Sequence, residues 1–312
     1  MLACPLCGTA GARQSGQLTG AQLRLLWREL GWEFSAEAWG QITPEFLVTL
    51  HRCARCGFEF FNPSLTGNET FYRELERADY FVENRPEFGR TLRFAQRRSV
   101  KTVLDVGCGS GIFLDQARAA DFQTWGLELN GAAAEKAEAK GHRISNCALE
   151  EISREQFDDG LNLVTIFQVL EHVGNPVRLL QKAATLLKPG GCIAVAVPAA
   201  EGVLRLVPWD PHQWPPHHVT RWRLKDFEQL ATAAGVNLIE SGGDQLLASE
   251  ILYYWKLRQR LGSAMGAPKK GGDSLVRLVS LLYRKAGMKW FFPRSGISIY
   301  AFFQLPAVSR GK

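Results

Sequence analysis

The sequence has no run of about 18 uncharged apolar residues, the shortest stretch that a membrane-crossing helix needs. Its first residues hold neither a basic segment nor an apolar core, so no secretory signal is visible. Without export the thiols are expected to stay reduced, and the seven cysteines therefore indicate free thiols or a bound metal rather than disulfides. We expect a cytoplasmic protein.

Acidic residues are scarce in only one part of the chain. Residues 250–312 contain 12 Lys/Arg and 2 Asp/Glu, whereas residues 1–249 contain 25 and 29. The net charge of +6 therefore arises in the C-terminal part, and this segregation indicates an anionic partner. With 46% hydrophobic and 22% charged residues, the 312-residue chain otherwise has the composition of a globular protein with a substantial buried core.

Two C-x-x-C-G motifs occupy residues 4–8 and 53–57, with 45 residues between the second and third cysteines. At this spacing both thiolates of a motif can reach one tetrahedral metal ion. The duplicated form disfavours a redox pair or unliganded thiols. We therefore expect residues 1–62 to form a small zinc-ribbon-like module, with helices over 19–30 and 44–50 and a short strand after the second motif. The predicted ligands of a structural zinc ion are Cys4, Cys7, Cys53 and Cys56.

A glycine-rich turn follows an apolar segment, and residues 103–111 read VLDVGCGSG. Glycines remove Cβ where the chain must bend sharply and where a ligand must approach the backbone. The following helix offers the unpaired N–H groups of its first turn to an anionic group. A second apolar strand ends at Glu128, 23 residues after Asp105, and a carboxylate at this place accepts hydrogen bonds from ribose hydroxyls. The sequence therefore predicts a cofactor crevice.

The spacing Asp-x-Gly-x-Gly-x-Gly resembles that of class I S-adenosylmethionine-dependent methyltransferases. The similarity extends over residues 70–305 and includes ALE at 148–150, QVLEH at 168–172 and LKPGG at 187–191. Alternating apolar strands and helices predict a parallel sheet covered on both faces. The resemblance implies an α/β fold with a doubly wound, mostly parallel, Rossmann-like sheet of seven strands, whose last two strands form an antiparallel hairpin.

The elements follow from this pattern. Strands are expected over 102–106, 124–129, 143–147, 161–168, 192–197, 236–241 and 297–305. Helices are expected over 69–78, 87–98, 111–120, 131–140, 176–187 and 223–234, and over 245–261 and 274–286 in an insertion. The expected division is a zinc module (1–62), a helical cap (63–98) and a methyltransferase domain (99–312) with a basic helical insertion (242–296).

The resemblance also implies how S-adenosylmethionine is held. The acidic residue and the glycine turn would bind the methionine end, a glutamate the ribose, and two leucines would flank the adenine. An amide at the end of the fourth strand lies on the face where open α/β sheets bind ligands. The implied residues are Asp105, Gly107, Gly109, Gly111, Glu128, Leu129, Leu149 and Gln168. An aromatic residue of the cap is expected over the sulfonium, unless it only anchors the cap to the core; the candidates are Tyr72, Tyr80 and Phe81.

A base is needed where the acceptor must lose a proton, and histidine is the natural base near neutral pH. His217 and His218 lie in the loop that usually lines the acceptor site and are preferred to His172; a structural role for one of them stays open. Ubiquinone-type O-methyltransferases place Glu-x-x-Glu-His at the position of residues 168–172 to hold a divalent metal. Here Gln168 replaces the first carboxylate, and its amide is a weak ligand for a hard cation. This departure argues against a catalytic metal.

The predicted function is methylation of a small molecule, or of a carrier-linked sugar, lipid-like or secondary-metabolite acceptor. A nucleic-acid or protein methyltransferase is one alternative; the fourth strand lacks the Asn/Asp-Pro-Pro-aromatic motif of the nucleic-acid enzymes. A catalytically silent cofactor-binding scaffold is another, against which the complete cofactor motif argues. Residues 245–294 combine basic residues with apolar helix faces, which indicates either docking onto an anionic membrane or carrier, or a packed helix with a solvated basic face.

Overall fold

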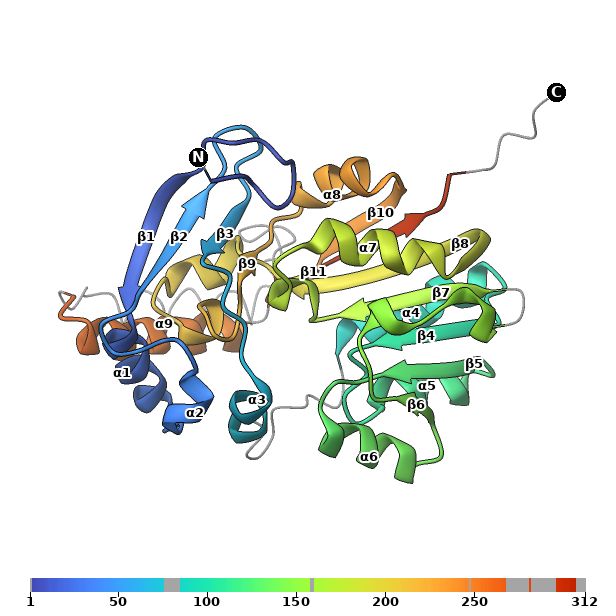
Figure 1. The fold of residues 1–312 in the computed structure, drawn as a ribbon, viewed down its shortest axis with the longest axis horizontal. Helices are drawn as coiled ribbons and strands as arrows, with labels where there is room; N and C mark the ends of the chain where they lie inside the picture. The colour runs from blue at the N-terminus through green and yellow to red at the C-terminus, as the bar shows by residue number, and fades with distance from the viewer. Residues whose placement is uncertain are drawn as a thin grey trace.

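The computed structural model describes residues 2–75, 85–157, 160–246, 248–267, 281 and 296–306, which contain two sheets side by side (Figure 1). The larger sheet has seven strands in the order β10-β11-β8-β7-β4-β5-β6. Strand β11 runs antiparallel to both of its neighbours, and β8, β7, β4, β5 and β6 are parallel. The strands are β4 (Thr102–Val106), β5 (Gln123–Leu127), β6 (Arg143–Ser145), β7 (Leu161–Phe167), β8 (Leu187–Pro198), β10 (Asn237–Gly243) and β11 (Ser298–Gln304). This confirms the expected doubly wound, mostly parallel sheet.

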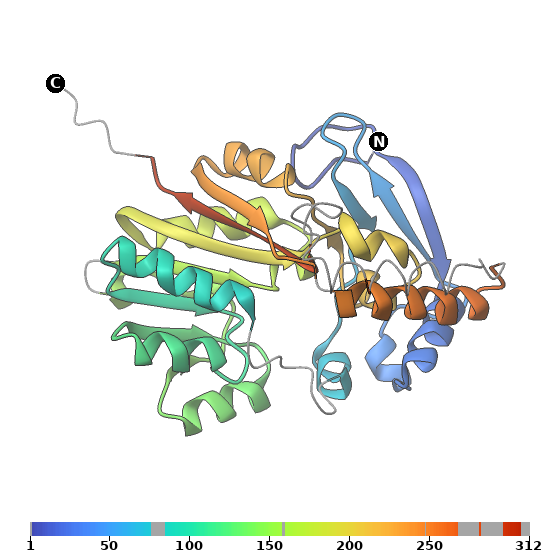
Figure 2. The same cartoon turned by 180° about the vertical axis from the view of Figure 1, so that it is seen from behind.

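Helices cover both faces of this sheet (Figures 1 and 2). On one face Leu104 and Val164 pack in a core cluster with α7 and α8, and on the other Val103 and Leu163 pack with α4 and α5. Neighbouring strand residues point to opposite faces, so a strand buried on both sides has to be apolar throughout. The helices are α4 (Pro86–Arg97), α5 (Ile112–Ala119), α6 (Gly131–Ala139), α7 (Pro176–Thr185) and α8 (Asp226–Ala234).

The N-terminal residues form a second, antiparallel sheet in the order β1-β2-β3-β9. Its last strand comes from the segment after β8, so the two parts of the chain share this sheet. Phe58 packs edge-on against Trp222 with ring centroids 4.9 Å apart, which joins the cores of both parts. The division at residue 62 stays a prediction. The elements are β1 (Arg13–Thr19), β2 (Leu47–Arg52), β3 (Glu59–Asn62), β9 (Thr220–Arg221), α1 (Gly20–Leu30), α2 (Ala36–Trp39) and α3 (Glu69–Leu75).

Of the two helices expected in the N-terminal part, one forms and the other does not. The helix expected over 19–30 forms as α1, because the Thr19 hydroxyl accepts from the Gln22 N–H while the Gln22 side chain accepts from the Thr19 N–H. The helix expected over 44–50 is wrong. Val48 and Leu50 are buried while their neighbours are not, and this period of two matches strand β2, which pairs with β1.

The expected insertion begins with helix α9 (Ala248–Ala264), close to the predicted 245–261. Its buried side chains join the core of the N-terminal part, and Arg260 pairs with Glu29 of α1 at 3.3 Å. This stretch is therefore a packed helix. The predicted second helix, 274–286, and the aromatic run 290–292 lie outside the described residues apart from residue 281. Contact with an anionic surface stays a prediction from the sequence.

Short 3-10 turns complete the described chain: η1 (Leu149–Glu151), η2 (Arg154–Phe157), η3 (Leu170–His172), η4 (Gly202–Leu206) and η5 (Pro211–Gln213). Strand β8 begins five residues before the expected start, because the chain bulges at the glycine pair of LKPGG and still pairs with β7. Among the described helices, none combines the length and apolar character needed to span a bilayer.

Candidate cofactor cleft, cysteine cluster and histidine cluster

A cleft of about 520 Å³ opens at the carboxyl ends of β4, β5 and β7. The chain turns from β4 to β5 on one side and returns to β7 on the other, and open α/β sheets bind ligands at such a switch point. The structure brings together nearly all the predicted cofactor residues here. Those that line the cleft are Asp105, Gly107, Gly109, Glu128, Leu129, Leu149 and Gln168.

The turn after β4 requires its glycines for two different reasons. Gly107 has a φ of +73°, and a Cβ there would lie 2.6 Å from Cγ2 of Val169. Gly111, the predicted residue that does not line the cleft, begins α5 with a φ of +79°. A Cβ on it would lie 2.8 Å from Cδ2 of His142. Gly111 therefore permits close packing behind the cleft, whereas Gly107 keeps the backbone open toward it.

Asp105 is the most deeply buried acid of the cleft, with 3% exposure. Its Oδ1 accepts a hydrogen bond from the Thr165 hydroxyl at 2.7 Å. Burial raises the pKa of Asp105 to about 7; the Thr165 hydrogen bond opposes this rise and the charge of Glu128 adds to it. A cationic ligand beside these two carboxylates would favour the ionised form of Asp105.

Glu128 connects the ends of two strands. Its Oε2 accepts from the Gly109 N–H at 2.8 Å and its Oε1 from the Asn130 N–H at 2.8 Å. A carboxylate oxygen has two lone pairs, so each can accept one hydrogen bond more. The adjacent Leu129 is 70% exposed at the cleft, which is unusual for a large apolar side chain and suits a ligand-covered position.

Gln168 links the end of β7 to the cap helix α4. It has a φ of +56°, and its Nε2 donates to Oε1 of Glu87 at 3.0 Å. Glu87 lies in the first turn of α4, where burial raises its pKa although Arg85 stands 3.8 Å away. Sequence reasoning missed Glu87, because a polar residue at the start of an amphipathic helix normally faces solvent and nothing local marks it as buried.

Of the predicted cap aromatics, Tyr72 lines the cleft, while Tyr80 and Phe81 lie outside the described residues. Phe88, which the prediction did not include, also lines it and packs at 5.4 Å between ring centroids against both Phe113 and Phe167. The sequence could have indicated Phe88, because it is an aromatic residue within the expected cap helix 87–98.

The structure groups the three predicted histidines, but only His172 lines the cleft. His217 and His218 lie behind it, with 3% and 4% exposure. Burial lowers the pKa of His172 to about 4 and that of His217 and His218 well below the usual value. All three imidazoles are therefore neutral near pH 7.

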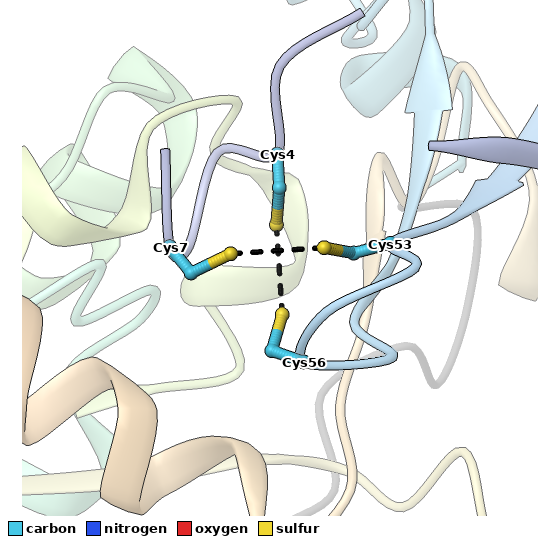
Figure 3. A group of neighbouring side chains, drawn as sticks. All are labelled: Cys4, Cys7, Cys53 and Cys56. Carbon is cyan, nitrogen blue, oxygen red and sulfur yellow. Dashed lines mark hydrogen bonds between the residues drawn. The ribbon is translucent and has the colours of Figure 1, made fainter. Parts of the chain in front are cut away.

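The four cysteines of the N-terminal motifs converge from two turns, one at the N-terminus and one between β2 and β3 (Figure 3). The Sγ atoms of Cys4 and Cys56 are 3.7 Å apart and those of Cys7 and Cys53 are 3.6 Å apart. A tetrahedral zinc ion with bonds of about 2.3 Å requires sulfur separations of about 3.8 Å. The cluster therefore has the size of a zinc site.

Comparison with known proteins agrees with this architecture. Residues 77–241, more than half of the chain, match a family described as "Methyltransferase domain". The protein therefore belongs to the methyltransferase domain family.

Two curated relatives are ubiquinone biosynthesis O-methyltransferases. The one from Albidiferax ferrireducens is 34% identical over 130 residues, which cover 36% of this chain and 52% of the relative. The one from Nitrosomonas europaea is 29% identical over 162 residues, covering 46% and 66%. The chain thus spans about half the length of the first and less than two thirds of the second. A solved SAM-dependent methyltransferase from Archaeoglobus fulgidus superposes with a TM-score of 0.46 at 15% identity, over 75% of this chain and 98% of that one.

Proposed function

We propose that the protein is a class I S-adenosylmethionine-dependent methyltransferase that acts on a small-molecule or carrier-linked acceptor. The observation that carries this proposal is one cleft that is lined by Asp105, Gly109 and Glu128, which follow or end strands β4 and β5, and also by Tyr72 and His172. Membership of the methyltransferase domain family supports the activity. Both curated relatives are O-methyltransferases, which supports a hydroxyl group as the methyl acceptor.

The residues of this chain suit that cofactor. S-adenosylmethionine, when bound, supplies a methyl group on a sulfonium, so the protein mainly has to bind and orient. Asp105 and Glu128 offer two carboxylates to a ligand that carries positive charge. The remaining lone pairs of Glu128 can accept from ribose hydroxyls, and Leu129 offers apolar surface to the adenine.

The predicted base remains a proposal for His172 alone, since His217 and His218 do not reach the cleft. The carbonyl of His217 accepts from Nδ1–H of His172 at 2.6 Å, which leaves the lone pair on Nε2. With a pKa of about 4, this imidazole can take a proton only as the acceptor becomes strongly acidic during methyl transfer.

We also propose that Cys4, Cys7, Cys53 and Cys56 bind one structural zinc ion. The matched turns support this proposal: the Gly8 N–H donates to the Cys4 carbonyl at 2.9 Å, and the Gly57 N–H to the Cys53 carbonyl at 3.0 Å. Four thiolates leave no open coordination position, which is typical of structural rather than catalytic zinc.

Calorimetry tests the cofactor and radiolabelled methyl transfer tests the reaction. Wild-type protein is expected to bind S-adenosylhomocysteine at micromolar order and not NADH. It is then expected to transfer label from S-adenosylmethionine to one member of a panel of phenols, catechols and sugars. NADH binding without affinity for S-adenosylhomocysteine would overturn the proposal. Binding without transfer to any acceptor class, including nucleic acid and protein, would favour the silent scaffold.

A further inference from the structure

Helix α3 connects the N-terminal part of the chain with the cleft. Gly67, Glu69 and Tyr72 of this segment line the cleft, whereas none of the described residues 2–62 does. Both views of the fold show α3 between the N-terminal helices and the larger sheet (Figures 1 and 2). The N-terminal part therefore reaches a bound ligand through α3 and not with residues of its own.

The position of α3 is decided by what packs against it. The helix has seven residues, and isolated helices shorter than about 12–15 residues are barely stable in water. The side chain of Phe71 is fully buried, and its ring centroid lies 4.7 Å from that of Phe34 and 5.9 Å from that of Trp27. The loop before β9 adds one hydrogen bond, from the Gly67 N–H to the Pro216 carbonyl at 2.6 Å. The N-terminal part thus supplies apolar surface on which α3 rests.

One residue of α2 holds the first turn of α3 by two hydrogen bonds. The Glu37 carbonyl accepts from Nδ2 of Asn68 at 2.7 Å, and Oδ1 of Asn68 in turn accepts from the Phe71 N–H at 2.8 Å. The buried Thr70 hydroxyl donates to Oε1 of Glu37 at 3.0 Å. Asn68 therefore caps α3 and connects the cap to Glu37.

The end of α3 is attached to the same N-terminal segment. The Ser35 N–H donates to Oε2 of Glu74 at 2.9 Å, and the Nε1–H of Trp32 donates to the Leu75 carbonyl at 3.3 Å. Residues 32–37 thus hold α3 at both ends, which fixes its direction as well as its place.

Tyr72 indicates which part of the cleft α3 borders. Its hydroxyl lies 3.1 Å from Nδ1 of His172, the proposed base, which also lines the cleft. A base has to lie within hydrogen-bond reach of the group that it deprotonates, so an acceptor bound at His172 is next to Tyr72. The predicted cofactor residues Asp105 and Glu128 belong instead to the ends of β4 and β5.

We propose that α3 forms the acceptor side of the cleft and that Glu37 is a positioning residue, which sets the place of α3 from the N-terminal part. The inference rests on the proposed function and adds which part of the chain selects the acceptor. A misplacement of about 1 Å can cost an enzyme about a hundredfold in rate. Loss of the Glu37 contact should therefore weaken acceptor binding and leave cofactor binding unchanged.

Peptide-resolved labelling with N-ethylmaleimide tests the place of α3 without a known acceptor. The thiol introduced by Tyr72→Cys is compared with the native Cys147, which lines the cleft near Leu149. Saturating S-adenosylhomocysteine should slow the labelling of Cys147 by about tenfold or more, and that of the introduced thiol by less than about twofold. Strong protection of the introduced thiol would place α3 over the cofactor and overturn the proposal. If calorimetry shows no binding of S-adenosylhomocysteine to wild type, the proposed function fails first and this inference fails with it.

Glu37→Ala tests the positioning role with the panel member that wild type methylates. We expect its KM for that acceptor to rise by about fivefold or more, with the Kd for S-adenosylhomocysteine within about twofold of wild type. Glu37→Gln keeps an acceptor oxygen for Thr70 and should restore most of the wild-type KM. Glu33→Ala removes an exposed acid of the same segment, so it is the matched control and should have wild-type constants.

Two further measurements separate positioning from a general loss of structure. Thr70→Val removes the same hydrogen bond from the side of α3, so its effect on KM should not add to that of Glu37→Ala. Hydrogen exchange should become faster in α3 of Glu37→Ala and stay unchanged in the glycine turn after β4, whatever the acceptor. Circular dichroism and bound zinc verify that each variant is folded. A wild-type KM in folded Glu37→Ala, or an equal loss of cofactor affinity, overturns the proposal.

Discussion

The N–H of Gly109 donates to Oε2 of Glu128 over 2.8 Å, so the carboxylate that follows β5 holds the glycine turn that follows β4. The same carboxylate accepts from the Asn130 N–H through its other oxygen. Glu128 therefore shapes the backbone of the proposed cofactor site and, through its remaining lone pairs, also offers acceptors to a ligand. A substitution at Glu128 tests both tasks at once.

Glu128→Ala is expected to weaken S-adenosylhomocysteine binding more than tenfold in calorimetry. It removes a charged acceptor, whose hydrogen bonds contribute about 1.5–3 kcal/mol each, and it releases the turn at Gly109. Glu128→Gln retains one acceptor oxygen and should lose less affinity. Glu138→Ala, on the exposed face of α6, is the control and should bind like wild type. Equal affinities for Glu128→Ala and wild type would show that this carboxylate does not contact the cofactor.

Asp105 makes the stability of the ligand-free protein depend on pH. Burial raises its folded-state pKa to about 7 from the ordinary value of 3.8, so the folded form retains a proton that the unfolded chain has lost. This stability is fully present below about pH 4 and is lost as the pH rises through about 7. Each unit of difference between the pKa in the folded and in the unfolded protein corresponds to about 1.4 kcal/mol of stability.

Asp105→Asn keeps an acceptor for Thr165 but cannot ionise. Relative to wild type, we expect its free energy of unfolding to increase between pH 5.5 and pH 8, by on the order of 1–3 kcal/mol. Urea unfolding of both proteins at the two pH values measures this double difference. Saturation with S-adenosylmethionine should reduce it, because a cationic ligand favours the ionised Asp105. A difference that is constant with pH would contradict the buried-acid interpretation.

The larger sheet was predictable because its strands are buried on both faces and are therefore apolar throughout, as Val103 and Leu104 illustrate. Reading strands from apolar patterns failed where a strand forms only because it pairs with a neighbouring strand. Strand β9 has two residues and exists only through its pairing with Phe60 and Glu59. Strand β2 was taken for a helix, because its alternating burial becomes evident only beside β1.

The candidate site shows the same limit. Spacing after β4 and β5 identified Asp105 and Glu128, since these positions depend on local chain order. The spacing could not distinguish Gly107, which faces the cleft, from Gly111, which packs on His142. Both positions require glycine because of their positive φ angles, and they differ only in their neighbours in space. The burial of Glu87 depends on a contact between residues 81 positions apart and has no local signal.

Removal of the proposed zinc ion should destabilise more than the N-terminal turns. Cys4 and Cys53 belong to the same core cluster as Phe58 and Trp222, so the metal site packs against the methyltransferase part. Cys4→Ser with Cys56→Ser is expected to lose the single bound zinc and to lower the midpoint of thermal unfolding of the whole chain. Cys147 is a half-buried cysteine outside the cluster, so Cys147→Ser should retain the zinc ion and the wild-type midpoint of thermal unfolding. Metal analysis and calorimetry decide; full zinc retention in the double variant would refute the assignment.

The hydrogen bond between Gln168 and Glu87 can be tested by exchanging the two residue types between the two positions. Nε2 of Gln168 donates to Oε1 of Glu87 at 3.0 Å; Glu87 is buried and Gln168 is half-buried. Gln168→Glu puts two carboxylates at this distance, so one of them must take a proton. We expect a loss of about 1–3 kcal/mol in the free energy of unfolding, smaller at pH 5 than at pH 7.5. Cofactor binding should also weaken, because α4 loses one of its attachments to the sheet.

The exchanged variant, Glu87→Gln with Gln168→Glu, restores one donor and one carboxylate in reversed positions. It should therefore recover most of the stability that Gln168→Glu loses, and a double-mutant cycle over the four proteins measures the coupling. Glu87→Gln alone should cost less than Gln168→Glu, since two amides can still form a hydrogen bond. If the exchanged variant is as unstable as the sum of the two single changes, the hydrogen bond does not hold α4 to β7. In that case α4 is held by its other contacts, among them the ion pair of Arg90 with Asp244 at 3.0 Å and the stacking of Phe94 on Phe302.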